Sequence, residues 1–240
     1  MAAHTVTHRP LTPAVGQSTL VHEVRGSRDY LVQKCGLPAG AVVGYRSPYR
    51  ITNPRLRATI QSLGFLYDST LTFQYSNMST RTWPFTEDHG LPDPSCPNCM
   101  PGERYSGVWQ VPVYALSYDG QVYKQDPGMG KNTARARAQS RSVYDVLMSV
   151  FNATYYHDED EGGFGGGGGN RAPITVAVHD YWLNDAQRVK DAQRFIRDVV
   201  ALPDVYFVTY RQLVEWMRGP VMTDKVGEWL KERCGAKELR

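Results

Sequence analysis

The chain has 240 residues and a formal net charge of +3, with 41% hydrophobic and 21% charged residues. This is the composition of a folded protein with a buried core, and the charge is too small and too scattered to predict a nucleic-acid surface. No apolar run reaches the roughly 18 residues of a membrane span, and the first residues are too polar for a signal peptide.

Helical and strand-like patterns alternate in the first part of the chain, which is the rhythm of an α/β fold. Apolar residues at helical spacing predict a helix over 18–34, and a short apolar run predicts a strand over 41–45. Asn53 followed by proline has the form of an N-cap and a first helical residue, which predicts a helix over 54–63. A further strand is predicted over 65–67.

The middle of the chain predicts a long loop, a strand, a helix and a linker. Pro, Ser, Thr and Cys dominate 77–107, a segment too long for an ordinary connection. A strand over 108–113 and a helix over 140–157 follow. The acidic and glycine-rich stretch 158–170 has neither a strand before it nor a Lys-Ser/Thr pair, so it predicts a flexible insertion and not a phosphate-binding loop.

The last third of the chain predicts two more strand and helix pairs. The strands are predicted over 174–178 and 205–208. Asn184 is expected to cap the helix after the first strand, and Thr209 begins a capping box before the second helix.

Two histidines near the start of the chain predict half of a metal site. His4 and His8 are four residues apart, and a helical or tight turn would bring both imidazoles to one face, where they can bind one Zn²⁺ at about 2.1 Å. A catalytic zinc takes a third protein ligand, and only three residues precede His4. Surface histidines on a frayed terminus are the alternative for an isolated pair.

Three polar residues directly follow predicted strands. Arg46, Asp68 and His179 each stand at such a strand end. In repeated βα units functional groups gather at the carboxyl ends of parallel strands, so we expect these residues on one rim. A structural ion pair for Arg46 and a buried hydrogen bond for His179 are the alternatives for each residue alone.

The four cysteines leave the redox state open. Cys35, Cys96, Cys99 and Cys234 allow two disulfides or four free thiols. Cys96 and Cys99 form a CxxC, but a structural zinc site of that kind needs a second pair of ligands at matching spacing, which the sequence lacks. An unrelated α/β domain with zinc at this CxxC is kept as a third hypothesis.

Seven short segments occur in a characteristic order from His4 to about Pro220. They are His4-Thr5-Val6-Thr7-His8, Gly44-Tyr45-Arg46-Ser47-Pro48-Tyr49, Tyr67-Asp68-Ser69, Trp83-Pro84-Phe85-Thr86, Val108-Trp109-Gln110-Val111-Pro112, Arg171-Ala172-Pro173 through His179 with Trp182-Leu183, and Tyr206-Phe207-Val208-Thr209-Tyr210 with Leu213 through Met217. Together they resemble the motifs of the NodB-type polysaccharide deacetylases, and within that family the chitin deacetylase-like branch.

The resemblance implies an α/β fold, a distorted (β/α) barrel that lacks its first strand. The deacetylase-like domain would cover 1–220, with the Gly-rich insertion over 158–170, and a helical tail would cover 221–240. The implied reaction is hydrolysis of N-acetyl groups from an N-acetylglucosamine polymer, with a polysaccharide or oligosaccharide as the partner. The implied location is extracellular or the cell wall, although no signal peptide stands in this chain.

The resemblance also assigns roles to individual residues. In the family two histidines and an aspartate hold a divalent metal, usually zinc, which here assigns His4 and His8. Arg46 would orient the general base, and His179 would protonate the leaving amine. The residues expected on the substrate side are Tyr49, Trp109 and Trp182, with plain packing as the alternative for the two tryptophans.

The chain departs from the family at the first motif. Both of the family's aspartates, one a metal ligand and one the base, lie on a strand upstream of the histidines, and this chain starts after that point. We therefore expect the third ligand to be missing and deacetylation to be weak or absent, since a general base alone is worth about 10² to 10⁴ in rate. A catalytically silent relative that binds glycan is the second hypothesis.

Overall fold

The computed structural model describes residues 1–73, 81–91, 99–100, 102–129, 141–156 and 170–233. The chain forms two compact units, each built from segments that are distant in sequence. The first unit contains Met1–Leu71, Pro84–Val111 and Pro203–Arg240, and the second contains Thr72–Trp83 and Pro112–Leu202.

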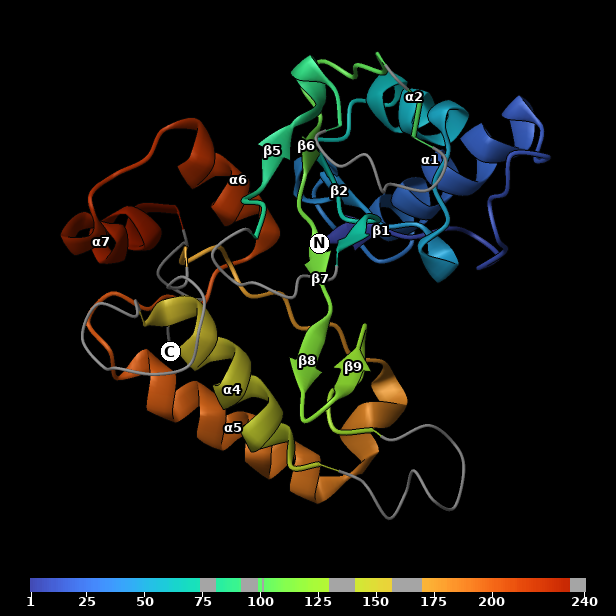
Figure 1. Ribbon diagram of the computed structural model, residues 1–240. Coiled ribbons are helices and arrows are strands. Elements are labelled where there is room, and N and C mark those ends of the chain that lie inside the picture. Colours follow the sequence, from blue (N-terminus) through green and yellow to red (C-terminus); the bar gives the residue numbers. More distant parts are fainter. Residues whose placement is uncertain (74–80, 92–98, 101, 130–140, 157–169, 234–240) are drawn as a thin grey trace. The chain divides into compact units, whose positions relative to one another are not determined.

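A five-stranded sheet lies at the centre of the first unit, in the order β1-β2-β3-β6-β5 (Figure 1). The strands β1 (Ala2–Ala3), β2 (Gly44–Tyr45), β3 (Tyr67–Asp68) and β6 (Trp109–Gln110) are parallel, and β5 (Phe85–Thr86) is antiparallel to β6. The α/β class is therefore confirmed, whereas the described strands form no closed barrel, and the barrel and its missing first strand stay predictions.

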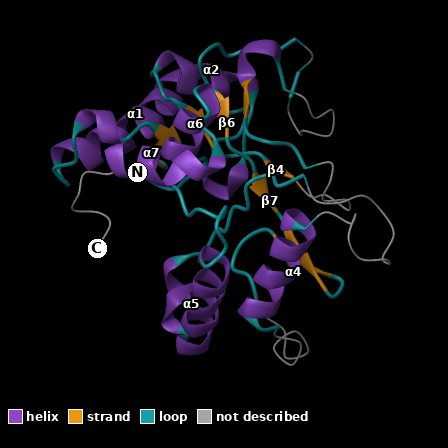
Figure 2. Ribbon diagram, turned by 90° about the vertical axis from the view of Figure 1, so that its left-hand side faces the viewer, coloured by secondary structure: helices purple, strands orange, loops and turns teal. Residues whose placement is uncertain are grey.

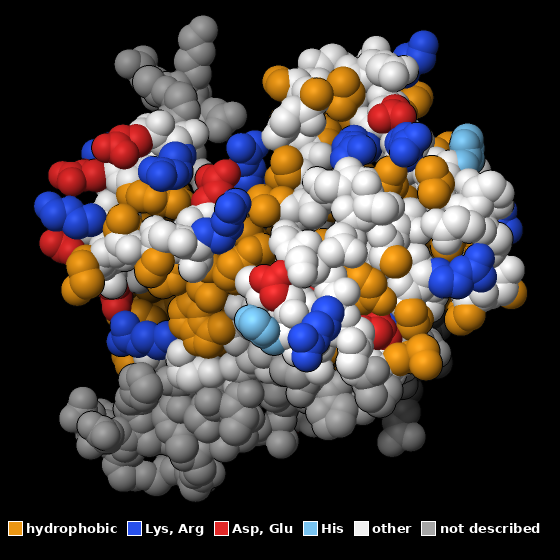
Figure 3. Space-filling view, turned by 90° about the horizontal axis from the view of Figure 1, so that it is seen from above, with side chains coloured by type: hydrophobic (Ala, Val, Ile, Leu, Met, Phe, Trp, Pro, Cys, Tyr) orange, Lys and Arg blue, Asp and Glu red, His pale blue; other side chains and the backbone are white. Residues whose placement is uncertain are grey.

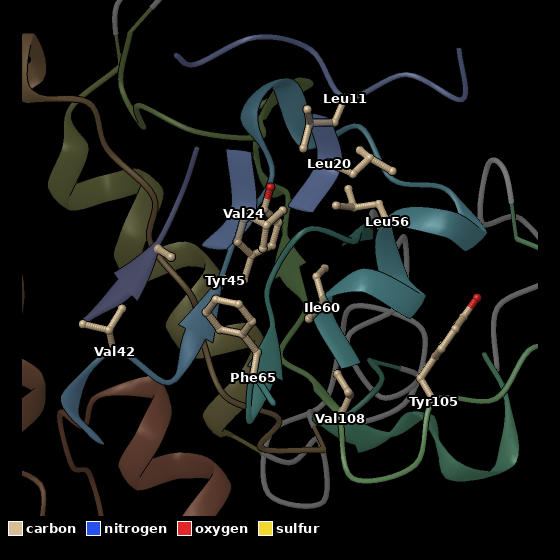
Figure 4. Packing of buried hydrophobic residues seen from close by; sticks show 11 residues of the cluster. Leu11, Leu20, Val24, Val42, Tyr45, Leu56, Ile60, Phe65, Tyr105 and Val108 are labelled. Atoms are coloured by element: carbon tan, nitrogen blue, oxygen red, sulfur yellow. The ribbon is translucent and has the colours of Figure 1, made fainter. Parts of the chain in front are cut away.

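Helices α1 (Gln17–Gln33) and α2 (Pro54–Ser62) pack together in the first unit. The Asn53 side chain accepts a hydrogen bond from the Leu56 N–H and so caps α2 as predicted. The apolar side chains of these helices and of the neighbouring strands form one core (Figure 4): Leu11, Leu20, Val24, Val42, Tyr45, Leu56, Ile60, Phe65, Tyr105 and Val108.

The C-terminal part of the first unit consists of α6 (Tyr210–Arg218) and α7 (Thr223–Arg233). Thr209 and Gln212 form the predicted capping box of α6. Two apolar residues of this helix, Leu213 and Val214, pack in a buried cluster with Tyr67 and Val111. The tail helix α7 thus follows a helix that is anchored on the sheet.

The second unit combines small sheets with a helix pair. Its strands are β4 (Thr72–Phe73), parallel to β7 (Val113–Tyr114), and the hairpin of β8 (Leu116–Tyr118) and β9 (Gln121–Tyr123). Helices α4 (Val143–Tyr155) and α5 (Ala186–Val200) lie side by side (Figures 1 and 2). Phe151 and Phe195 meet edge to face between these helices.

Short 3-10 helices connect several of these elements. They are η1 (Ala39–Ala41), η2 (Pro48–Arg50), η4 (Glu87–His89) and η5 (Asp180–Asn184). The first of them takes up the start of the strand predicted over 41–45, so that strand is shorter than expected. The second begins two residues after Arg46 and contains Tyr49.

The strands predicted over 174–178 and 205–208 are wrong. Neither segment pairs with a described strand, and Val176, Val178 and Phe207 are 43%, 42% and 53% exposed. An apolar run becomes a strand only where a neighbour forms a continuous ladder of backbone hydrogen bonds with it. The Asp126 N–H donates to the Ala177 carbonyl at 2.8 Å, but neither run takes part in such a ladder among the described residues.

Three other predictions needed correction. The strand over 108–113 is split into β6 and β7 because Pro112 has no N–H to continue the ladder. The cap of α5 is Asp185 and not Asn184, since the Asp185 carboxylate accepts from two backbone N–H groups. The loop over 77–107 contains β5, and the glycine tract over 158–170 lies almost wholly outside the described residues.

Charged residues are distributed without an evident single-sign region on the face in Figure 3, where basic and acidic side chains of the described residues are interspersed. None of the described helices is both long enough and apolar enough to cross a bilayer.

Candidate functional site

His4, Arg46 and Ser69 directly follow the parallel strands β1, β2 and β3, so they lie at the carboxyl ends of neighbouring strands in the first unit's sheet. Ala3 lies opposite Tyr45 in the sheet, so the next residues along β1 and β2 are neighbours. The Arg46 N–H donates to the Ala3 carbonyl at 3.1 Å, and the His4 ring nitrogen Nδ1 lies 2.6 Å from the Arg46 carbonyl oxygen. The structure therefore joins the first predicted metal ligand to the predicted arginine.

The two histidines lie close together after β1. Their ring centroids are 5.0 Å apart, with His4 half-buried and His8 exposed. Since a carbonyl only accepts hydrogen bonds, the His4 Nδ1 carries the proton and Nε2 has the free lone pair. Burial lowers the pKa of His4, which favours the neutral ring.

This pair fits one divalent metal ion in part. Two imidazoles that bind one tetrahedral Zn²⁺ at about 2.1 Å have ring centroids about 5 Å apart, as His4 and His8 do. A backbone carbonyl on the second nitrogen of a ligand histidine is also a common arrangement. However, the described residues contain no group of three histidine, cysteine or acidic side chains that could hold a metal. A third ligand is not supplied by them.

The Arg46 side chain is held in one position. Its Nε donates to the Ser69 carbonyl at 3.0 Å, and its Nη2 donates to the Ser69 hydroxyl at 2.9 Å and to the Tyr210 hydroxyl at 3.2 Å. The backbone after Arg46 is fixed as well, because the Ser47 N–H donates to the Thr70 hydroxyl at 3.0 Å. The guanidinium is thus a preorganised positive charge beside the histidine pair.

Asp68 is not a rim residue but part of a buried polar network. It is 1% exposed, and it accepts hydrogen bonds from the Thr70 hydroxyl and, at 3.2 Å, from the Gln110 amide. The same amide donates to Glu87 at 3.0 Å. Burial and the nearby Asp68 charge raise the pKa of Glu87 to about 8. Sequence reasoning missed Glu87 and Gln110 as network members, and no pattern in the sequence marks them as buried.

The substrate-side predictions in the first unit concern Tyr49 and Trp109. Tyr49 is 66% exposed, has a backbone φ of 56°, and packs its ring against His8 at 5.1 Å. Trp109 is half-buried and packs against the cluster that contains Tyr67 and Val111. Tyr49 therefore lies beside the histidine pair with most of its surface accessible, while contact of either residue with substrate stays a prediction.

His179 belongs to the second unit, where Asp126 holds it. The Asp126 carboxylate lies 2.6 Å from the His179 Nδ1 and accepts from the His179 backbone N–H at 2.8 Å. The Tyr181 hydroxyl reaches the same carboxylate at 3.0 Å, and its ring stacks on the imidazole with centroids 4.9 Å apart. This arrangement leaves Nε2 of His179 available for proton transfer.

Asp126 was missed by the sequence reasoning. Its only signal was the Asp-Pro-Gly sequence of a tight turn, in which Asp126 adopts a positive φ of 53°. Trp182 is 3% exposed and donates its indole N–H to the Pro127 carbonyl at 2.9 Å, so it stabilises this turn. The expected meeting of His179 with His4, His8 and Arg46 in one pocket stays a prediction.

The cysteines exclude one hypothesis. Cys99 is disulfide-bonded, and Cys35 is free and exposed. A disulfide sulfur is not a thiolate ligand, so the hypothesis of a structural zinc at the CxxC is wrong.

Comparisons with known proteins agree with the fold. A crystal structure of a putative polysaccharide deacetylase from Mycobacterium smegmatis matches 90% of this chain and 62% of its own chain, with a TM-score of 0.59 and 19% identity. Chitin deacetylase 1 of Bombyx mori is 26% identical over 99% of this chain, and chitin deacetylase 8 of Bombyx mori is 23% identical over 94%. No family model matches the chain.

These similarities agree with the resemblance of the chain's motifs to those of the polysaccharide deacetylases. Both of these Bombyx mori relatives are chitin deacetylases. The chain spans only about half the length of these relatives, 44% of the first and 57% of the second.

Proposed function

We propose that this chain carries part of the active site of a metal-dependent deacetylase that removes N-acetyl groups from a chitin-like N-acetylglucosamine polymer. The observation that carries the proposal is the bond between His4 and Arg46, in a chain that aligns over 99% of its length with a chitin deacetylase. The partner would be a polysaccharide or oligosaccharide.

His4 and His8 would hold the metal, with zinc as the expected ion. When bound, such an ion polarises the acetyl carbonyl and lowers the pKa of a bound water. The Arg46 carbonyl fixes the proton of His4 on Nδ1, which orients Nε2 and raises its basicity as a ligand. A third ligand would have to come from outside the described donor groups.

Arg46 and His179 would act on the charges and protons of the reaction. The Arg46 guanidinium, locked by Ser69 and Tyr210, would orient the general base at no further cost in ordering. During hydrolysis the oxygen of water bonds to the acetyl carbon, the C–N bond breaks, and the amine nitrogen takes a proton. His179 would donate that proton from Nε2, with Asp126 holding the ring in position.

Zinc binding and acetate release from chitin oligomers test this proposal. We expect the chain to bind Zn²⁺ weakly and to release acetate slowly, since the described residues contain no third ligand beside the histidine pair. His4→Ala and His8→Ala should abolish Zn²⁺ binding, whereas His89→Ala, at an exposed histidine, should not. Equal zinc affinity in all four proteins would refute the metal site.

The hydrolytic roles have their own test. Wherever acetate release can be measured, Arg46→Lys should lower it about 10²-fold and Asp126→Asn about 10-fold or more, because each removes hydrogen bonds that position a reacting group. Acetate release at an enzyme-like rate from the unaltered chain would show that another residue replaces the base.

A catalytically silent glycan-binding relative is the second candidate. The missing group of three metal donors among the described residues favours it. Such a protein would bind chitin oligomers without zinc and release no acetate, whereas the deacetylase would gain acetate release on addition of zinc.

We also propose an extracellular or cell-wall location. A chitin-like polymer is an extracellular substrate, and the disulfide at Cys99 supports an oxidising compartment. Fractionation of cells that express the full-length protein would test this, and retention of the protein in the cytosol would contradict it.

A further inference from the structure

The loop that carries both histidines rests on helix α1 through one carboxylate. Glu23 is 2% exposed, and both of its oxygens are used by Thr7, the residue before His8. The Thr7 N–H donates to Oε2 at 3.0 Å, and the Thr7 hydroxyl donates to Oε1 at 2.7 Å. The loop between the histidines is therefore bonded to a helix that carries neither of them.

Glu23 makes these bonds as an ion. Burial alone would raise the pKa of Glu23, but hydrogen bonds from Thr7 and from the Val6 N–H outweigh burial and lower the pKa below its ordinary value. Hydrogen bonds to a charged acceptor are stronger than those between neutral groups. The contact between Glu23 and Thr7 therefore fixes the short loop between the two histidines to α1.

Gly26 gives the loop room to lie on the same helix. It stands one turn after Glu23 and on the same face of α1. A Cβ atom at this position would lie 2.8 Å from the Val6 Cγ2 atom, closer than real Cβ contacts. Val6 is 48% exposed, so its position is not set by burial in the core. The absence of a side chain at Gly26 thus lets the loop approach α1.

The backbone of the loop needs such support. His8 has a φ of 56°, in the left-handed region that residues with a side chain seldom adopt. A loop without an anchor would relax this residue and change the direction of its ring. Because the ring centroids of His4 and His8 are 5.0 Å apart, a small rotation at His8 would separate two donors that fit one ion.

We propose that Glu23 and Gly26 are positioning residues that hold His4 and His8 at the separation that one metal ion requires. This inference rests on the proposed metal site and extends it to a helix outside the site. Neither residue would contact the metal. Each would act through Thr7 or Val6, the residues between the two histidines.

Zinc affinity measured against stability tests the role of Glu23. Glu23→Gln keeps the shape of the side chain but removes its charge and one acceptor, and Glu228→Gln on the exposed surface of α7 is the matched control. The dissociation constant for Zn²⁺ should rise about 10- to 100-fold in Glu23→Gln and stay unchanged in the control. Thr7→Val should also weaken binding of Zn²⁺. Thr7→Ser, which keeps the hydroxyl, should bind Zn²⁺ like the unaltered chain.

Gly26→Ala separates positioning from stability. Alanine favours a helix over glycine, so a general loss of structure is not the expected result of this change. We expect weaker Zn²⁺ binding with no fall in the unfolding temperature of the metal-free chain. Val6→Ala in the same protein should restore the affinity, because it removes the atom that the new Cβ would meet.

Two results would overturn the inference in different ways. If the unaltered chain binds Zn²⁺ and both Glu23→Gln and Gly26→Ala bind it equally well, positioning by α1 is refuted and the proposed metal site stands. If the unaltered chain binds no Zn²⁺, the proposed metal site fails and the inference fails with it. Protection of the Thr7 amide from hydrogen exchange, expected in the unaltered chain and lost in Glu23→Gln, confirms the anchor without metal.

Discussion

Glu87 offers a test of the buried polar network that includes Asp68 of β3 and Gln110 of β6. Its side chain lies 1% exposed among Asp68, Gln110, Arg57 and Glu103, and its pKa is raised from 4.5 to about 8 by burial and by the Asp68 charge. Among the described residues neither Oε2 of Glu87 nor Oε1 of Gln110 has a hydrogen-bond partner. We expect a neutral Glu87 carboxyl group below about pH 8, because burial and the Asp68 charge disfavour its ionised form.

The size of the effect follows from proton linkage. The folded state binds the Glu87 proton more tightly than the unfolded state, so its contribution to stability is fully present below about pH 4.5 and is lost as the pH rises through about 8. At about 1.4 kcal/mol per pH unit, the full loss is about 5 kcal/mol. Glu87→Gln keeps a neutral group, so it should remove most of this pH dependence.

Urea unfolding from about pH 5 to about pH 9 would measure the effect. We expect similar stability of the two proteins at the acidic end, and Glu87→Gln to be about 2–5 kcal/mol more stable at the alkaline end. Glu232→Gln, at a side chain 76% exposed, is the control and should follow the unaltered chain. Parallel pH profiles for Glu87→Gln and the unaltered chain would refute a neutral, buried Glu87.

Two further changes test the packing of the first unit. A Cβ at Gly44 would overlap the ring of Tyr67 on the adjacent strand, so Gly44→Ala should lower the free energy of unfolding by about 3 kcal/mol. Urea titration would measure this loss, and an unchanged midpoint would contradict the packing. Arg57 is buried with Glu103 and donates to it at 2.7 and 2.9 Å. Arg57→Met should lower the free energy of unfolding by about 3–5 kcal/mol, because it leaves the Glu103 charge buried without its ion-pair partner. A loss below about 1 kcal/mol would show that water reaches Glu103.

Local signals in the sequence predicted the helices well. Asn53 with its following proline and Thr209 with Gln212 act through atoms a few residues away, so the sequence alone locates these helix starts. The apolar runs 174–178 and 205–208 have the composition of strands, but strand formation depends on a partner elsewhere in the chain. Sequence composition contains no information about that partner.

The candidate site was predictable from the sequence only in part. His4 and Arg46 follow two parallel strands, so their meeting follows from β pairing once the strands are recognised. Asp126 meets His179 across 53 positions of sequence, and Glu23 meets Thr7 across 16. Those pairings depend on how loops and helices pack, which no periodic pattern of residue types specifies.

The two-residue length of β1 has a consequence for how the proposed site would be lost. One short edge strand sets the alignment of His4 with Arg46, and edge strands open by local fraying at far lower free energy than a core unfolds. Heat or mild denaturant would therefore separate His4 from Arg46, and with it disrupt the proposed metal site, while most of the spectroscopic signal of the fold persists. To stabilise the proposed site, engineering should first fix the amino-terminal strand in place and only then improve the packing of the core.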